Sequence, residues 1–136
     1  MDLHSKKIKG YEIQKTMHTG LIGRALKKAM NRHPGLTGAI HPSDRGSQYT
    51  NHGYLQQLAD YGLQSSMSAK GNCYDNAAVE TFFKTIKAEL IWRRSWETRR
   101  KAETAIFQYI NGFYNPRRRH SALRGKSPLA FERQVA

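Results

Sequence analysis

The spacing of apolar residues along the chain predicts four helices. In each of four segments, apolar side chains recur every three or four residues, which is the period of one helix face. The segments cover residues 19–32, about 50–61, 76–91 and 98–114. Pro34-Gly35, Gly62 and Asn115-Pro116 follow three of them and are typical helix terminators. We therefore expect a core built mainly from helix faces.

Short apolar stretches between these helices predict strands. The stretch from Ile8 to Ile13 alternates imperfectly, residues 38–41 form a short apolar run that leads into a loop, and residues 63–67 are a further candidate strand. Asp75 comes just before the third helix, where its carboxylate would cap the first backbone N–H groups.

The expected core of the C-terminal half consists of two apolar helix faces. These faces carry Val79, Phe82, Phe83, Ile86 and Leu90, and then Ala102, Ala105, Ile106, Tyr109, Ile110 and Phe113. Trp92 and Trp96 lie between the two helices. Large aromatic rings more often anchor a core or an interface than stack on bases, so we expect the anchoring role for both.

Composition narrows the fold and points to a polyanionic partner. The 136 residues include only two valines, so the chain is helix-dominated, disordered or missing part of its sheet. Seven Tyr, five Phe and two Trp argue against disorder. The net charge is +13, and residues 93–133 alone hold 11 Lys/Arg and three Glu. A folded protein with this charge is expected to bind a polyanion.

Several other classes of protein are excluded. No apolar run approaches the roughly 18 residues of a membrane span, and the first residues lack the apolar core of a signal peptide. We therefore expect a cytoplasmic protein with no membrane partner. Cys73 is the single cysteine, which excludes an intramolecular disulfide and a cysteine-based zinc site.

Two acidic residues are candidates for chemistry. Asp44 lies in the predicted loop Pro42–Gly46 at the end of a strand, and Glu80 lies 36 positions later on a helix. Lys84 and Lys87 share the helix face of Glu80 to within about 40°. A carboxylate beside two ammonium groups suits a divalent cation and the phosphates around it. The alternative is a turn-forming Asp and a solvated Glu–Lys pair.

Three separated segments resemble one known family. They read HPSDRGSQYT, GNCYDNAAVETFFKTIKAEL and FYNPRRRHSALRGKSPLAFE. Together they resemble the second half of the integrase core of bacterial insertion-sequence transposases, which are relatives of retroviral integrases. The resemblance covers about Asp2 to Phe131. It implies an α/β, ribonuclease-H-like integrase core that lacks its first strands and is helix-dominated with a short residual sheet. Residues 1–136 would form one partial catalytic core, with a basic tail motif over residues 113–136.

The resemblance also implies roles for individual residues. Asp44 resembles the second acid and Glu80 the third acid of an Asp, Asp, Glu triad that holds two Mg²⁺ or Mn²⁺ ions for DNA strand cleavage and transfer. Residues 71–76 resemble a mobile loop, and Lys87 resembles a DNA-contacting residue. The basic clusters 93–94, 99–101 and 117–119 are either ordinary solvated surface or phosphate contacts. The DNA-binding candidates are Lys84, Lys87, Arg117, Arg118, Arg119 and His120.

The chain departs from the family pattern at its start. MDLHSKK resembles the end of the second strand, so the first catalytic aspartate has no counterpart here. We therefore expect no strand transfer by this chain alone. The expected partners are DNA, as transposon ends and target, and a second copy or a full-length transposase, in a bacterial cytoplasm. The alternative is a non-catalytic DNA-binding or transposase-interacting remnant. A ribonuclease-H-like nuclease is disfavoured by the tail motif.

Overall fold

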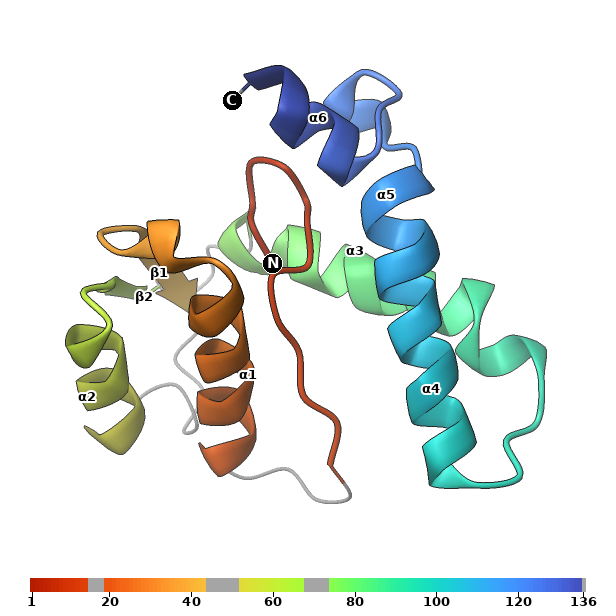
Figure 1. The fold of residues 1–136 in the computed structure, drawn as a ribbon, viewed down its shortest axis with the longest axis horizontal. Helices are drawn as coiled ribbons and strands as arrows, with labels where there is room; N and C mark the ends of the chain where they lie inside the picture. The colour runs from red at the N-terminus through yellow and green to blue at the C-terminus, as the bar shows by residue number, and fades with distance from the viewer. Residues whose placement is uncertain (15–18, 44–51, 68–73, 136) are drawn as a thin grey trace. The chain divides into compact units, whose positions relative to one another are not determined.

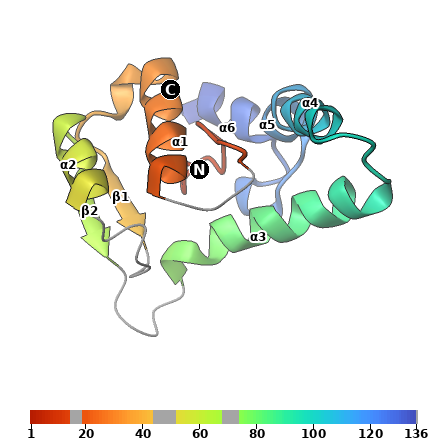
Figure 2. The same cartoon turned by 90° about the horizontal axis from the view of Figure 1, so that it is seen from below.

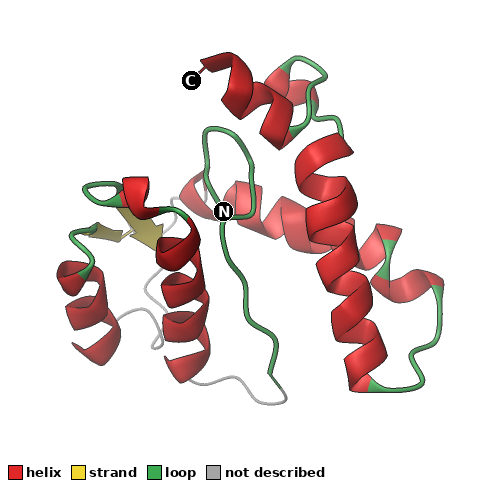
Figure 3. Cartoon of the chain, in the orientation of Figure 1, coloured by secondary structure: helices red, strands yellow, loops and turns green. Residues whose placement is uncertain are grey.

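The part of the chain that the structure describes consists of helices and a small two-stranded sheet (Figures 1 and 3). The computed structural model describes residues 1–14, 19–43, 52–67 and 74–135. Two compact units emerge, one formed by Met1–Ile8 with Val79–Ala136 and the other by Lys9–Ala78. The predictions for Asp44, for Cys73 and for residues 71–73 of the loop lie outside the described residues.

The unit Lys9–Ala78 contains the sheet. Its elements are α1 (Thr19–Arg32), a 3-10 turn at Pro34–Leu36, β1 (Ile40–Ser43), α2 (His52–Asp60) and β2 (Gln64–Met67). The strands pair in parallel, from Ile40 opposite Gln64 to Ser43 opposite Met67, and Figure 2 shows both arrows pointing the same way. Gly62 lies two residues beyond the end of α2, and its φ of +74° favours glycine at this helix terminus. The predicted helices and two of the predicted strands are thus confirmed in this unit.

The packing of this unit follows the apolar period of its helices. Leu26 and Met30 of α1 are buried against Tyr54 and Leu58 of α2. Strand β1 extends two residues beyond the prediction, through Pro42 and Ser43. A proline lacks a backbone donor and is therefore tolerated where a strand has a paired neighbour on one side, as β1 has in the described sheet.

The predicted strand at residues 8–13 is wrong. This segment is extended but pairs with no strand among the described residues. Its backbone packs directly on α1: a Cβ added at Gly10 would lie 2.7 Å from the carbonyl oxygen of Ala25 and 2.8 Å from the amide nitrogen of Ala29. Glu12 also forms an ion pair with Lys28 of α1 at 2.8 Å. Packing against a helix has replaced pairing with a strand.

The C-terminal part of the chain is helical. Its elements are α3 (Tyr74–Glu89), α4 (Arg99–Tyr109), a π-helical turn (Ile110–Tyr114), α5 (Asn115–Arg117) and α6 (Pro128–Val135), with 3-10 turns at Ile91–Arg93 and Ser121–Leu123. The N-cap prediction for Asp75 is wrong, because α3 begins at Tyr74 and a cap must precede the first helical residue. Helix α4 does have a side-chain cap, since the hydroxyl of Thr98 accepts a hydrogen bond from the Lys101 amide at 3.1 Å.

Asn115-Pro116 does not end the last long helix. The chain stays helical to Arg117 because the π turn widens the backbone just before the proline. The amide of Asn115 bonds to the carbonyl of Ile110, and that of Arg118 to Phe113 at 2.8 Å, both spanning five residues. This spacing accommodates a residue that has no amide donor and that would disrupt an ordinary α-helical turn.

The core of this unit contains fewer residues than the sequence predicted. Phe82 and Ile86 of α3 are buried, and Phe82 meets the buried ring of Tyr114 edge-on at 5.0 Å. Phe83 and Phe113 were expected in the core but are 53% and 41% exposed. Phe83 lies about 100° around α3 from Phe82. The extra residue of the π turn moves Phe113 off the buried stripe of Ile110 and Tyr114.

Candidate functional site

Helix α3 presents Glu80, Lys84 and Lys87 on an exposed face. The buried stripe of Phe82 and Ile86 sets this orientation, because at 100° per residue Glu80 and Lys84 lie about 160° around the helix from Phe82 and Lys87 lies about 140° from it. The sequence-predicted grouping of one carboxylate with two ammonium groups is therefore present on the surface of α3.

The carboxylate of Glu80 is available for a ligand. It forms no hydrogen bond or ion pair with any residue in the described part of the chain. Carboxylate oxygens are the ligands that hard divalent cations prefer, so the donor chemistry fits such an ion. The described residues contain no group of three or more His, Cys, Asp or Glu side chains that could hold a metal. A complete site would thus need ligands beyond the described residues.

His41 lies on β1, three residues before Asp44. Its Nε2 atom is 3.1 Å from the hydroxyl of Tyr54, and the two rings meet edge-on at 5.9 Å. Burial lowers the pKa of His41, so the imidazole is neutral near pH 7. This contact ties the strand that leads to Asp44 to helix α2.

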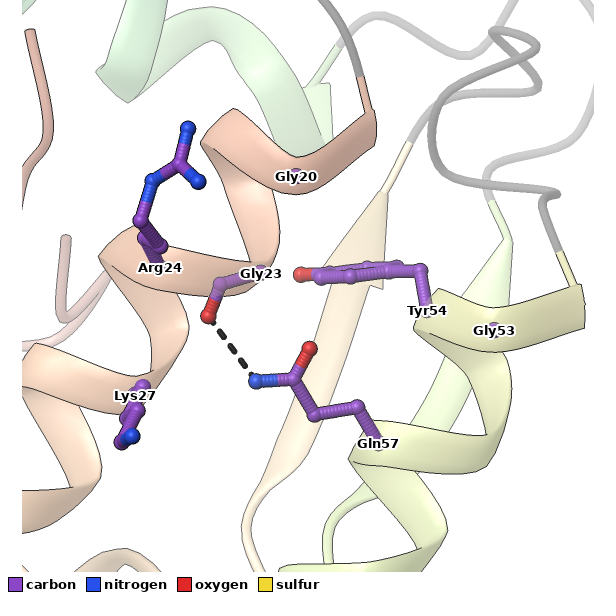
Figure 4. Close-up of a pocket in the computed structure, with 7 residues that line it drawn as sticks. All are labelled: Gly20, Gly23, Arg24, Lys27, Gly53, Tyr54 and Gln57. Carbon is purple, nitrogen blue, oxygen red and sulfur yellow. Dashed lines mark hydrogen bonds between the residues drawn. The ribbon is translucent and has the colours of Figure 1, made fainter.

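A groove lies between α1 and α2, with a volume of about 370 Å³. Figure 4 shows Tyr54 and Gln57 reaching from α2 towards the glycines of α1. Gln57 donates to the carbonyl of Gly23 at 2.9 Å, and a Cβ at Gly23 would lie 2.7 Å from the Gln57 side-chain oxygen. The side-chain amide of Gln57 already joins α2 to α1. We therefore attribute the groove to the packing of these two helices.

Arg118 is held inside the C-terminal unit by Glu89, the last residue of α3. The Arg118 Nε atom donates to both Glu89 oxygens, at 2.9 and 3.1 Å, and the Tyr109 hydroxyl donates to the same carboxylate at 2.8 Å. Burial, and then the Glu89 carboxylate, raise the pKa of Tyr109. Glu89, Arg118 and Tyr109, here called the Glu89 cluster, join α3, α4 and the tail.

His120 packs against Tyr114, with the rings edge-on at 5.2 Å. Its backbone bonds to Lys126, where the amide of His120 donates to the carbonyl at 3.1 Å. Burial lowers the pKa of His120, and the charges of Arg118 and Lys6 lower it further. A neutral, half-buried imidazole is a weak partner for phosphate, so the contacts of His120 indicate a packing role.

The other predicted cations divide into paired and available groups. On α4, Arg99 forms an ion pair with Glu103 at 2.8 Å, and Lys101 forms one with Glu97. Two of the three cations in cluster 99–101 are therefore partly neutralised. Arg117 and Arg119, like Lys84 and Lys87, are exposed and have no carboxylate partner in the described part of the chain.

Asn115 is a structural residue that sequence reasoning treated only as a helix terminator. Its side chain is buried and clamps the backbone of Ile8, accepting from the amide at 2.9 Å and donating to the carbonyl at 3.1 Å. Nearby, Glu132 of α6 accepts from Ser5 and Lys7, each at 3.0 Å. The signal for Asn115 was its place next to the apolar stripe of the last helix; Glu89 had no local signal, because its partners are 20 and 29 residues away.

The fold and the site together indicate a class of protein. Parallel strands joined through helices, together with a carboxylate and cations on one helix face, are typical of α/β proteins that act on polyanions. Two family profiles, both described as integrase core domain, match residues 1–73 and 61–128. The chain belongs to the integrase core domain family, whose fold is ribonuclease-H-like and whose members generally depend on divalent metal ions.

Relatives with curated names are bacterial insertion-sequence proteins. The transposase for insertion sequence element IS904 of Lactococcus lactis is 44% identical over 98% of this chain and 53% of its own length. The IS600 uncharacterized 31 kDa protein of Shigella sonnei is 42% identical over 96% of this chain and 48% of its own. Transposase InsF for IS3fB of Escherichia coli is 40% identical over 98% and 46%. The chain thus spans about half the length of these relatives.

No solved structure gives a significant match to the chain. Among the described residues, every helix is too short or too polar to cross a membrane.

Proposed function

We propose that this chain is the metal- and DNA-binding part of a catalytic core for DNA transposition. The observation that carries the proposal is the exposed face of α3, where the Glu80 carboxylate stands beside Lys84 and Lys87 without a partner in the described part of the chain. The names of the relatives support the same reading, since two of them are transposases of insertion sequences.

In this proposal, Asp44 and Glu80 are two of the carboxylates that hold two Mg²⁺ or Mn²⁺ ions. Such ions, when bound, activate the attacking oxygen and stabilise the leaving oxygen of a phosphodiester. The contact of His41 with Tyr54 would keep the strand before Asp44 in place, and burial of Phe82 and Ile86 would keep Glu80 outward.

The proposed phosphate contacts are Lys84, Lys87, Arg117 and Arg119. All four are exposed cations with no carboxylate partner in the described part of the chain. We assign Arg118 and His120, which were also DNA-binding candidates, to support of this surface, because both face inward in the C-terminal unit. The proposed partners are transposon-end and target DNA, with a second copy or a full-length transposase as protein partner.

A second candidate function applies to these 136 residues taken by themselves. The triad implied by the resemblance has three carboxylates, and these residues offer matches for two, Asp44 and Glu80. By themselves they would act as a DNA-binding module that joins transposase assemblies without performing chemistry.

Salt-dependent DNA binding tests the shared part of both functions. If about six phosphates are contacted, log K for a duplex should fall against log[salt] with a slope near −5. The double variant Lys84→Gln/Lys87→Gln should reduce the slope by about 2, whereas Lys101→Gln on the compensated face of α4 should change it little. A slope near zero for the unmodified chain would refute the electrostatic surface.

Metal-dependent strand joining separates the two functions. We expect the 136-residue polypeptide to bind DNA and to join no strands in Mg²⁺ or Mn²⁺. Joining that disappears in Asp44→Asn would show that the polypeptide is itself active and would overturn the non-catalytic alternative.

A further inference from the structure

Trp92 is an exposed aromatic ring next to two arginines. It lies in the 3-10 turn Ile91–Arg93 after α3 and is 73% exposed, more than any other large apolar side chain that the structure describes. Trp92 was expected to anchor a core or an interface, and its exposure shows that it does not anchor a core. A tryptophan side chain that is this exposed contributes little burial energy to the fold. Large exposed apolar groups mark contact sites.

The turn that carries Trp92 is held in place on both sides. The Nε atom of Arg93 donates to the carbonyl of Ala88 at 3.0 Å, which fastens the turn to the end of α3. The indole nitrogen of Trp96 donates to the carbonyl of Ile91 at 3.1 Å, which fastens it from the other side. A ligand that binds Trp92 would therefore meet an ordered backbone, and less conformational freedom would be lost on binding.

The charges around Trp92 specify the chemistry of that ligand. Arg94 lies over the ring of Trp96, with its central carbon 4.6 Å from the ring centroid. A stacked guanidinium keeps its N–H edges directed outward for phosphate. Neither Arg93 nor Arg94 has a carboxylate partner among the residues described. An aromatic face beside two arginines is complementary to a base with its phosphates.

We propose that Trp92, Arg93 and Arg94 form a binding site for unpaired nucleotides of single-stranded DNA. One base stacks on the Trp92 indole, and the neighbouring phosphates contact the two guanidinium groups. Bases inside a duplex are already stacked on each other and offer no free face, so the site selects unpaired strands without reading sequence. This inference rests on the proposed DNA-binding function and adds the form of DNA that this part of the surface takes.

A second copy of the chain is the competing occupant. Two copies meeting at Trp92 would bring four arginines together, and like charges across an interface disfavour association. Charge complementarity therefore favours the nucleic acid.

Fluorescence of Trp92 tests the proposal. The chain has two tryptophans, and Trp96 is kept because it fastens the turn, so subtracting the signal of Trp92→Phe from that of the unmodified chain gives the signal of Trp92. We expect oligothymidylate of about twelve nucleotides to quench this fluorescence in step with binding measured by anisotropy. A blunt duplex of the same length should bind without comparable quenching.

Affinity measurements complete the test. Trp92→Ala should weaken oligothymidylate binding by about 5- to 100-fold, and Trp92→Phe should restore most of the loss. Binding of the blunt duplex and its salt slope should stay unchanged. Phe83→Ala is the matched control, because it removes another exposed aromatic ring, 53% exposed, from the same unit and should leave oligothymidylate affinity unchanged.

Three outcomes would overturn the site. They are unchanged Trp92 fluorescence at saturating oligothymidylate, equal affinity of Trp92→Ala and the unmodified chain, and a dimer in sedimentation that Trp92→Ala dissociates. Failure of the proposed function looks different, since duplex binding would then lack salt dependence whatever Trp92 does.

Discussion

Replacing Arg118 by glutamine removes the cation that faces the Glu89 carboxylate and keeps a polar side chain. Glu89 would lose the two contacts from Arg118, at 2.9 and 3.1 Å, and keep the one from Tyr109. Hydrogen bonds to charged groups contribute about 1.5–3 kcal/mol. The Arg118 and Glu89 side chains retain 26% and 30% exposure, so water offsets part of this loss. We expect a destabilisation of about 2 kcal/mol and a fall in the unfolding midpoint of roughly 6 °C.

Urea unfolding followed by tryptophan fluorescence measures this effect in the relevant unit. Trp92 and Trp96 both lie in the unit formed by Met1–Ile8 and Val79–Ala136, so the signal reports on the Glu89 cluster directly. A double-mutant cycle with Glu89→Gln should give a coupling energy of about 1 kcal/mol or more.

The matched control is the neighbouring arginine. Arg117→Gln removes an exposed cation, so stability should change by less than about 0.5 kcal/mol while the salt slope for duplex DNA weakens by about 0.9. Arg118→Gln should show the reverse, with lower stability and an unchanged slope. If Arg118→Gln left stability intact and weakened the slope as Arg117→Gln does, the structural role of Arg118 would be refuted.

Three further predictions concern packing and pH. Asn115→Ala leaves the Ile8 amide and carbonyl unpaired at a buried position, so we expect a loss of about 2 kcal/mol and faster hydrogen exchange at the Ile8 amide; unchanged exchange would contradict the clamp. Gly10→Ala should destabilise by more than about 1 kcal/mol in thermal unfolding, because its Cβ would lie 2.7 Å from backbone, whereas Gly35→Ala has nothing within 4 Å and should be neutral. Since burial lowers the pKa of His120 from 6.5, the unfolded chain takes up the proton first and stability falls as the pH drops below 6.5. His120→Phe should flatten this loss in urea unfolding between about pH 7.5 and 5.5, and an equal slope in the variant would count against it.

The sequence predicted the elements whose apolar period is set by local burial. Helix α1 matches its predicted range of 19–32, and both strands of the parallel pair lie within two residues of theirs. The exposed face with Glu80, Lys84 and Lys87 was also predictable. The buried residues Phe82 and Ile86 fix the rotation of α3 and thereby the direction in which its other side chains point.

What the sequence could not show depends on distant partners. An arginine in a run of three looks like a phosphate contact, and only the position of Glu89, 29 residues earlier, turns Arg118 inward. The Asn115-Pro116 pair looks like a helix end because local rules do not include a π turn that absorbs the proline. The exposure of Trp92 likewise follows from the tertiary packing of residues 88–96.

The clamp of Asn115 on Ile8 also sets the order in which the chain can fold. Residues 9–78 form an uninterrupted stretch, whereas the other unit needs residues 1–8 together with Asn115 and Glu132. During synthesis at roughly 5–20 residues per second, residues 9–78 are complete several seconds before Glu132 is made. Residues 1–8 must therefore stay undocked until Asn115 and Glu132 have left the ribosome.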